Sequence, residues 1–413
     1  MAATIIGAAT VAIWFYLLFF RGAFWWLPYR SAPVEASTSG RSVAAVIPAR
    51  DEAAVIGRSV ASLLAQDYPG PFHIVVVDDQ SGDGTAEAAR AAAAAAGAPD
   101  RLTICDGQAL PPGWTGKLWA MRQGVEAAWS MRPDYLLLTD ADIVHASGNL
   151  RELVSRCEAG FDLASLMVKL HCLSLSEVLL IPAFVFFFFK LYPPGWVTDA
   201  ARRTAAAAGG CMLIRATSLE RIGGIDSIRG EVIDDCALAR RVKATGKVWL
   251  GPAQDTISIR EYRSWSSIWD MVVRSAFAQL GYSAVMLALT LSGLTLTYLA
   301  PPLLLVSSQP AAMLCGGLAW LGMTIAFLPT LRAYEAPRSI APLLPLIALF
   351  YVAATVASAL QFWRGRGGYW KGRFQAPAPN RTLISAPSAI GAAMRRCRRR
   401  SVPRRAVRRA RRR

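Results

Sequence analysis

Two apolar blocks, one near each end of the chain, constrain the fold more than any other feature of this sequence. Residues 3–20 contain no charged side chain and are long enough to cross a bilayer. The second block occupies residues 283–362, and the stretch between the blocks is polar and rich in motifs. A mean hydropathy of +0.33 is too high for an ordinary soluble enzyme. The blocks therefore predict a membrane-anchored protein with a polar domain between its anchors.

The first block predicts an N-terminal transmembrane anchor within residues 1–30. Arg21, Trp25 and Arg30 follow the apolar stretch, and basic and aromatic side chains together mark the cytoplasmic membrane interface. A cleaved signal peptide is disfavoured because the segment has no basic start and no convincing small-residue cleavage site. We therefore expect a signal anchor with its N-terminus outside the cell, followed by a polar linker over residues 31–41.

The second block predicts three C-terminal transmembrane segments within residues 283–363. Three spans after a cytoplasmic domain would put the basic residues 364–413 outside, which contradicts the positive-inside rule. One segment is therefore expected to be re-entrant, or the number of spans is smaller. The proline-containing region 283–308 is our first candidate for the irregular segment.

Two further apolar segments are predicted to lie on the membrane surface. Residues 261–281 have the pattern of an amphipathic helix. The stretch 175–192 is very apolar, but Pro182 interrupts it and it is short for a span. Both segments are expected to be interfacial helices.

The formal net charge of +17 is concentrated at the C-terminus. Residues 395–413 contain twelve arginines and no acid, and removing these twelve charges leaves +5. Such a run is typical of a solvated arm that can contact anionic lipid. We predict a basic, disordered tail over residues 364–413 and no nucleic-acid partner, with polyanion binding as an alternative.

The polar region alternates apolar runs with helical patterns, and acidic residues follow the runs. Apolar runs begin at Ser42, Phe72 and Tyr135, and helices are expected between them. This alternation predicts an α/β domain with a parallel, doubly wound sheet over residues 42–260. Ligands bind such sheets at the carboxyl ends of the strands.

The run that begins at Tyr135 ends in Asp140 and Asp142, which are separated by one residue. Two carboxylates at such a short spacing repel each other unless a cation lies between them. Mg²⁺ binds one or two protein carboxylates together with phosphate oxygens. The pair predicts a divalent metal that carries a nucleotide diphosphate, and an ordinary acidic loop is the alternative.

Three more residues are candidates for the same site. Asp79 follows the second strand and could accept from a base N–H, although it could instead cap the turn 81–85. Lys117 lies near a predicted helix start, where cation and helix N–H groups can meet phosphate, or it is a surface lysine. The third candidate is one of the adjacent acids Asp234 and Asp235 at another helix start, which could deprotonate an acceptor hydroxyl, or these acids could simply favour that start.

Five motifs in this order resemble those of the family-2 glycosyltransferases, which bind nucleotide sugars on a GT-A fold. The resemblance covers roughly residues 42–280. The motifs are Val46–Glu52, Val77–Thr85, Gly116–Lys117, Asp140–Asp142 and Ile233–Asp235. Flanking segments, of which 363–373 is one, further resemble the hopene-associated glycosyltransferases.

The resemblance implies a role for each matching residue. Asp140 and Asp142 would hold the ribose and a Mg²⁺ or Mn²⁺ ion, and Asp235 would be the general base. Arg274 falls on the arginine of the Q-x-x-R-W motif, but Met271 and Ser275 replace its glutamine and tryptophan, which argues for transfer of a single sugar. The expected donor-binding residues are Pro48, Arg50, Glu52, Asp79, Lys117, Asp140 and Arg274.

Together these observations predict an inverting, metal-dependent glycosyltransferase. It would move one sugar from a nucleotide sugar, preferably a UDP-sugar, to a membrane lipid such as a hopanoid. We expect a multi-pass protein of the inner cell membrane whose catalytic domain faces the cytoplasm. The alternatives are transfer to polyprenyl phosphate and a non-catalytic protein that binds nucleotide sugars.

Overall fold

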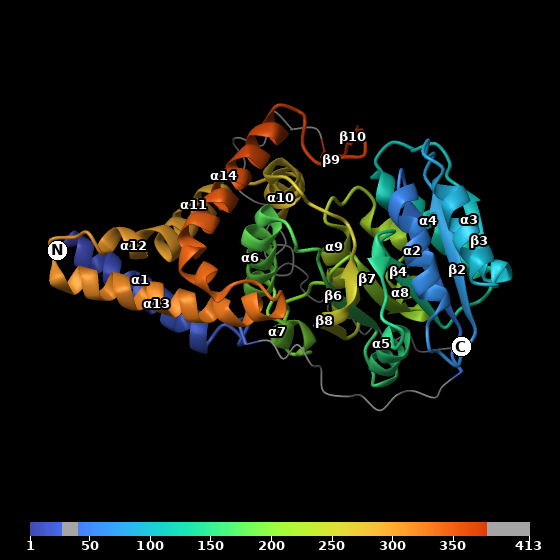
Figure 1. Cartoon of the computed structure of the whole chain (residues 1–413), viewed down its shortest axis with the longest axis horizontal. Coiled ribbons are helices and arrows are strands. Elements are labelled where there is room, and N and C mark those ends of the chain that lie inside the picture. Colours follow the sequence, from blue (N-terminus) through green and yellow to red (C-terminus); the bar gives the residue numbers. More distant parts are fainter. Residues whose placement is uncertain (27–39, 378–413) are drawn as a thin grey trace, which may run out of the picture. The chain divides into compact units, whose positions relative to one another are not determined.

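An eight-stranded sheet with helices on both faces forms the centre of the polar region (Figure 1). The computed structural model describes residues 1–26 and 40–377. Most of the predicted linker and the arginine run at 395–413 lie outside the described residues.

The strand order in the sheet is β3-β2-β1-β4-β7-β6-β8-β5. Strands β3, β2, β1 and β4 are parallel to one another, whereas β7 runs antiparallel to both β4 and β6. The α/β fold is confirmed, but the sheet is mixed rather than wholly parallel, because β7 and β5 run opposite to the other six strands. The strands are β1 (Val43–Ala49), β2 (Phe72–Asp78), β3 (Leu102–Asp106), β4 (Tyr135–Thr139), β5 (Ile143–Val144), β6 (Leu163–Lys169), β7 (Cys211–Arg215) and β8 (Val248–Ser258).

Both faces of the sheet are buried, which explains why β1 is apolar throughout. Val43 and Ile47 belong to one hydrophobic core, and Ala44 and Val46 belong to the other, as the alternation of side chains along a strand requires. Helices α2, α3 and α5 contribute to the first core, and α4 and α9 contribute to the second. The helices of this region are α2 (Ala53–Leu64), α3 (Thr85–Ala95), α4 (Gly116–Trp129), α5 (Asn149–Glu158), α8 (Ala216–Arg221) and α9 (Asp234–Lys243).

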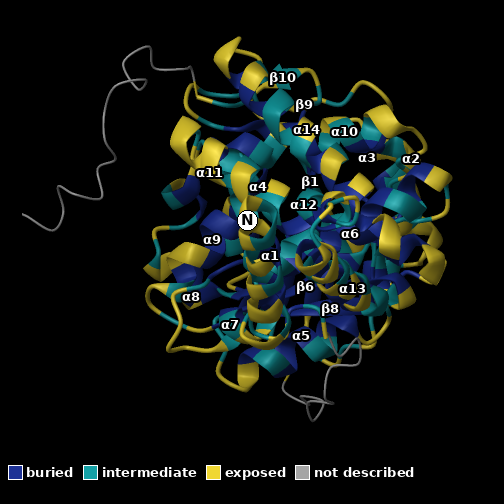
Figure 2. Ribbon diagram, turned by 90° about the vertical axis from the view of Figure 1, so that its left-hand side faces the viewer, coloured by how far each residue is buried: buried dark blue, intermediate teal, exposed yellow. Residues whose placement is uncertain are grey.

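Four helical segments of the described chain are long and apolar enough to cross a membrane. Many of their large apolar side chains, such as Phe19, Leu303 and Leu346, are exposed, and Figure 2 shows exposed residues along α1. Apolar surface of this extent is typical of contact with lipid. The segments are α1 (Ala2–Phe19), α11 (Ala284–Leu294) continued by a π-helical turn and α12 (Ala300–Leu304), α13 (Pro310–Ala333), and a 3₁₀ turn continued by α14 (Leu344–Trp363).

Helices α6 (Leu175–Leu191) and α10 (Trp265–Gln279) connect the sheet region to these apolar helices (Figure 1). Helix α6 runs through Pro182 without a break and packs against α13 and α14. Its start is fixed by a capping box, in which Ser174 and Glu177 satisfy each other's backbone N–H groups. Helix α10 packs along α14, where the Ser358 hydroxyl donates to the Val273 carbonyl. A five-residue helix, α7 (Pro194–Thr198), follows α6.

The chain after α14 is folded rather than disordered as far as residue 377. Strands β9 (Tyr369–Trp370) and β10 (Arg373–Phe374) form an antiparallel hairpin. The predicted tail over residues 364–413 therefore begins too early, because its first part makes specific contacts with the sheet region that are described below.

Candidate active site

A cavity of about 450 Å³ opens at the carboxyl ends of β1 and β4. The Asp140 and Asp142 motif lies on its wall beside the start of α9, so the structure brings together sequence motifs that are far apart in the chain. Arg50 and Asp79 lie beside the cavity rather than in its lining. The predicted site residues in the lining are Pro48, Glu52, Lys117, Asp140, Asp142, Asp235 and Arg274.

One lysine and three carboxylates form what we call the reaction-end cluster: Lys117, Asp140, Asp234 and Asp235. Lys117 extends from the first turn of α4, and its Nζ lies 2.8 Å from Asp140 Oδ1 and 3.2 Å from Asp234 Oδ2. The surface-lysine alternative is therefore wrong. Burial alone would lower the pKa of Lys117, but the adjacent carboxylates outweigh burial and raise it. Lys117 is a fixed cation inside this cluster.

Asp235 has the environment of a base that functions near neutral pH. Its carboxylate accepts hydrogen bonds from the backbone N–H groups of Gly209 (2.8 Å) and Cys236 (2.6 Å). Burial, and then repulsion by Asp234, raise the pKa of Asp235 to about 6. A side chain at position 209 would crowd this site, because a Cβ there would lie 3.3 Å from both Asp235 Oδ2 and Lys117 Nζ.

Asp142 is held by residues that arrive from the end of β8. The Ser258 hydroxyl donates to Asp142 Oδ2 at 2.8 Å, and Arg260 Nε donates to the same oxygen at 3.1 Å. Arg260 also reaches Glu52, with Nη2 2.6 Å from Oε1. Arg260 therefore joins the loop after β1 to the loop after β4, a role that the sequence did not indicate.

The two aspartates of the motif fit a metal that is shared with a ligand. Asp140 Oδ2 and Asp142 Oδ1 have no hydrogen-bond partner among the described residues, because each side chain makes its polar contacts through its other oxygen. Within the same residues no three metal-binding side chains cluster together. Two carboxylates suit a divalent ion that takes its remaining ligands from phosphate and water.

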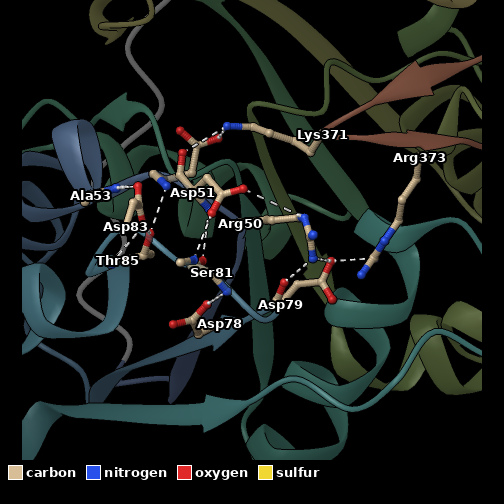
Figure 3. A network of polar contacts seen from close by, with 12 residues as sticks. Arg50, Asp51, Ala53, Asp78, Asp79, Ser81, Asp83, Thr85, Lys371 and Arg373 are labelled. Carbon is tan, nitrogen blue, oxygen red and sulfur yellow. Dashed lines mark hydrogen bonds and ion pairs between the residues drawn. The ribbon is translucent and has the colours of Figure 1, made fainter.

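Asp79 lies at the other end of the site, in what we call the nucleoside-end cluster: Arg50, Glu52, Asp79, Lys371 and Arg373. Asp79 is 1% exposed, and Arg373 Nη1 donates to its Oδ2 at 2.8 Å (Figure 3). Arg50 donates to the Asp79 carbonyl at 2.6 Å. Burial raises the pKa of Asp79, whereas Arg373 and Arg50 act in the opposite direction.

The alternative role of Asp79, as a cap for the following turn, is wrong. Asp78 Oδ1 accepts from the Ser81 N–H at 2.9 Å, and Asp83 bonds both Thr85 and Ala53 (Figure 3). Other carboxylates therefore hold this turn, and Asp79 pairs with Arg50 and Arg373 instead. Its Oδ1 atom is buried and has no hydrogen-bond partner among the described residues.

The side of the cavity nearest the apolar helices is lined by large apolar side chains. Phe184 and Phe188 come from α6, and Met271 comes from α10 beside Arg274. The cavity therefore has a charged floor and an apolar wall that belongs to the two helices predicted to be interfacial.

Lys371 and Arg373 are the functional candidates that sequence reasoning missed, together with Arg260. Their segment resembles a family motif, but its composition predicts a disordered tail. No local pattern could have connected them with Glu52 or Asp79, from which they are separated by more than half of the chain.

Comparison with known proteins is consistent with this geometry. A family model described as "Glycosyltransferase like family 2" matches residues 40–268. A mannosyltransferase from Pyrobaculum calidifontis, solved with GDP-Man and Mn²⁺, has a similar fold with a TM-score of 0.51 at 18% identity, covering 87% of this chain and 98% of that chain. A glucosyl-3-phosphoglycerate synthase from Mycobacterium tuberculosis is more distant, with a TM-score of 0.40 at 18% identity, covering 62% of this chain and 84% of that chain. A search of curated protein sequences finds no significant match.

Proposed function

Because the chain belongs to glycosyltransferase-like family 2, we propose that it transfers one sugar from a nucleotide sugar to a membrane lipid with inversion of the anomeric centre. The observation that carries this proposal is the position of Asp235. It lines the same cavity as the Asp140–Asp142 motif, and its pKa is raised to about 6 by burial and by repulsion from Asp234. A nucleotide sugar bound in this cavity would have a base for the acceptor and carboxylates for a metal ion within one site.

The chain's own residues supply each part of a single displacement. Asp235 would remove the proton from the acceptor hydroxyl while its oxygen attacks the anomeric carbon. The bond from that carbon to the phosphate oxygen breaks, and the nucleoside diphosphate leaves with the electron pair. Lys117 would stabilise the negative charge that develops on this leaving group. Attack opposite the leaving group inverts the anomeric centre.

Asp140 and Asp142 would hold a divalent metal, Mg²⁺ or Mn²⁺, when the donor binds. Their unpaired oxygens support this assignment, and Lys117, Ser258 and Arg260 would orient the two carboxylates. The bound ion would neutralise charge on the diphosphate. A UDP-sugar is our preferred donor.

The proposed acceptor is a lipid with a hydroxyl group, such as a hopanoid. The apolar wall formed by Phe184, Phe188 and Met271 supports this choice, because an apolar chain would gain burial there. The large exposed apolar area of the terminal helices provides a second reason, since it would keep the cavity at the surface of a bilayer.

We further propose that α14 lies along the membrane surface and does not cross it. Just before it, Glu335 pairs with Lys169 of β6 at 2.8 Å, and just after it, Lys371 pairs with Glu52 at 3.2 Å. Both ends of α14 thus contact the sheet region. Three crossing segments remain, and they would leave the basic residues after α14 on the cytoplasmic side of the inner membrane, as the positive-inside rule requires. The irregular segment is then α14 rather than the region 283–308.

Arg274 supports a second candidate acceptor, polyprenyl phosphate. It lines the apolar end of the cavity and forms no ion pair with a described residue, so its charge is available to an anionic acceptor. A phosphate acceptor needs no deprotonation, and Asp235 would then be dispensable. The hydroxyl lipid remains the preferred acceptor because Asp235 has the properties of a base.

Transfer of radiolabelled sugar into extractable lipid tests the proposal. Membranes that contain the wild-type protein or Asp235→Asn would receive a panel of UDP- and GDP-sugars, with Mg²⁺, Mn²⁺ or EDTA. We expect label in lipid with the wild-type protein and metal only. Equal labelling by Asp235→Asn would favour polyprenyl phosphate. Metal-dependent nucleotide binding without transfer from any donor would refute the transferase and favour a sensor.

A further inference from the structure

The hairpin formed by β9 and β10 lies against the donor side of the cavity although it follows the last apolar helix. Gly368, Tyr369, Lys371 and Gln375 all line the cavity. Figure 3 shows Lys371 and Arg373 extending from the hairpin towards the loops after β1 and β2. The nucleoside end of the site is therefore closed by a segment outside the residues that match the family model.

The hairpin is built so that Lys371 stands at its tip. Trp370 pairs with Arg373, so Lys371 and Gly372 form a two-residue turn, and their φ angles of 45° and 84° are those of a type I′ turn. The left-handed region suits Gly372 but is uncommon for a lysine. At the base of the hairpin, Gly368 also has a positive φ, and a Cβ there would lie 2.9 Å from the Ala376 nitrogen.

Backbone strain recurs on the surface that the hairpin meets. Asp51 has a φ of 51° and Gln80 a φ of 57°, and both follow the strands that carry the predicted nucleoside residues. Strained non-glycine residues persist where the surrounding structure holds them, and they are enriched at binding sites. Lys371 Nζ donates to the Asp51 carbonyl at 3.0 Å, so two strained residues contact each other.

The charges at this end indicate what the hairpin cations do. Glu52 is paired with both Arg260 and Lys371, which gives this carboxylate two cationic partners. Arg260 is shared with Asp142. Because Lys371 also lines the cavity, its ammonium group can contact an anion that binds there. Arg373 has a different role, because it forms the closest ion pair of the buried Asp79, whose distance from Arg50 is 3.7 Å.

Two buried polar atoms beside the hairpin lack partners among the described residues. They are Gln375 Nε2, on the cavity wall, and Asp79 Oδ1. A buried polar group without a hydrogen bond is costly, so such groups are expected to have a partner in the working state. A ligand with both hydrogen-bond donors and acceptors, such as a nucleoside, would satisfy them.

We propose that the β9–β10 hairpin is part of the donor site, with Lys371 binding the diphosphate of the nucleotide sugar and Arg373 positioning Asp79 for the nucleoside. This inference rests on the proposed function, since it requires a nucleoside diphosphate in the cavity. The last segment of the described chain thus completes a site that begins at β1.

Binding of nucleotides and nucleosides to the purified full-length protein tests the role of Lys371. The probes are UDP and GDP, with uridine and guanosine as phosphate-free counterparts, each titrated with Mn²⁺ present. We expect Lys371→Asn to weaken diphosphate binding about tenfold or more while nucleoside binding is unchanged, because a charge-assisted contact to phosphate is lost. Asparagine tolerates the left-handed region, so the turn should persist.

Two further variants provide the controls. Lys371→Arg should retain most of the affinity for diphosphate. Arg366→Asn removes an exposed cation from the same segment and should bind all probes as the wild type does. Equal weakening of diphosphate and nucleoside binding by Lys371→Asn would show a purely structural hairpin and would overturn the assignment, as would unchanged binding of both.

Arg373 is tested by the pH dependence of nucleoside binding. Arg373→Gln should weaken nucleoside and diphosphate binding equally and shift the loss of binding at acidic pH to higher pH, and Arg373→Lys should restore part of both. An unshifted pH profile would overturn the positioning role. If the wild-type protein binds none of the four probes, the proposed function itself fails, whereas normal wild-type binding with unaffected variants refutes the hairpin assignment alone.

Discussion

The two ends of the cavity neutralise their acids in different ways. At the reaction end, three aspartates share the single cation Lys117. At the nucleoside end, Asp79 and Glu52 are served by Arg50, Arg373, Lys371 and Arg260. One end has an excess of negative charge, whereas at the other Asp79 and Glu52 each have two cationic partners, of which Arg260 is shared with Asp142.

This difference in charge balance suits two different functions, catalysis and donor recognition. Excess negative charge raises the pKa of a carboxylate and attracts a divalent ion, and both effects suit proton removal and diphosphate departure. A paired and buried carboxylate keeps its charge and orientation, which suits recognition of a base. Substitutions at the reaction end should therefore act on kcat, whereas those at the nucleoside end should act on the KM for the donor.

The largest expected effect belongs to Asp235. Asp235→Asn should lower kcat by about 10²- to 10⁴-fold, because the acceptor hydroxyl would lose the general base that we propose. Nucleotide binding should change little. Steady-state transfer assays with a titrated donor would measure both constants, and Asp226→Asn, which removes an exposed carboxylate outside the cavity lining, is the control. A similar kcat for Asp235→Asn and wild type would contradict the assignment of catalysis to the reaction end.

The pH dependence of transfer provides a second test of the reaction end. Asp235 must be deprotonated to act as a base, so kcat/KM should rise with pH through about 6 and then level off. Below that value the rate should fall about tenfold per pH unit. Because Asp234 contributes to the raised pKa of Asp235, Asp234→Asn should move the profile towards lower pH. A profile that stays flat between pH 5 and 8 would contradict this account.

The smallest of these effects is expected at the nucleoside end. Asp79→Asn should raise the KM for the donor about tenfold, which is the usual size of a lost hydrogen bond to a charged group, and should alter kcat much less. The same steady-state assay, with kcat and the KM for the donor both fitted, shows which of these constants changes. A fall in kcat without a change in KM would show that Asp79 acts on the reacting centre. The two ends of the cavity would then not differ in function.

Local patterns were sufficient to find the charged floor of the site. Apolar runs that end in acids predicted Asp79, Asp140 and Asp142 at strand ends, and the helix starts of Lys117 and Asp235 were found from the same kind of signal. All five positions depend on their immediate neighbours in the chain. The candidate membrane anchors could also be predicted from the sequence, because length and composition define an apolar helix.

The remaining parts depend on contacts between distant segments. Arg260 is 208 positions from Glu52, and Lys371 is 320 positions from Asp51, so neither has a neighbour in the sequence that reveals its partner. The direction of β7 was not predictable either, because an apolar run indicates a strand but not its orientation. Sequence patterns located the acids and Lys117, and only the folded chain identified Arg260, Lys371 and Arg373 as partners of these acids.

The return of the hairpin to the first two strands has a consequence for synthesis of the protein. The ribosome completes every acidic residue of the cavity before it reaches Lys371 and Arg373, which it adds only after the last apolar helix. A nascent or prematurely terminated chain would thus have the acids but not their last two partners. We therefore expect nonsense mutations even within the last apolar helix to abolish donor binding, so that only a chain translated past that helix would become active.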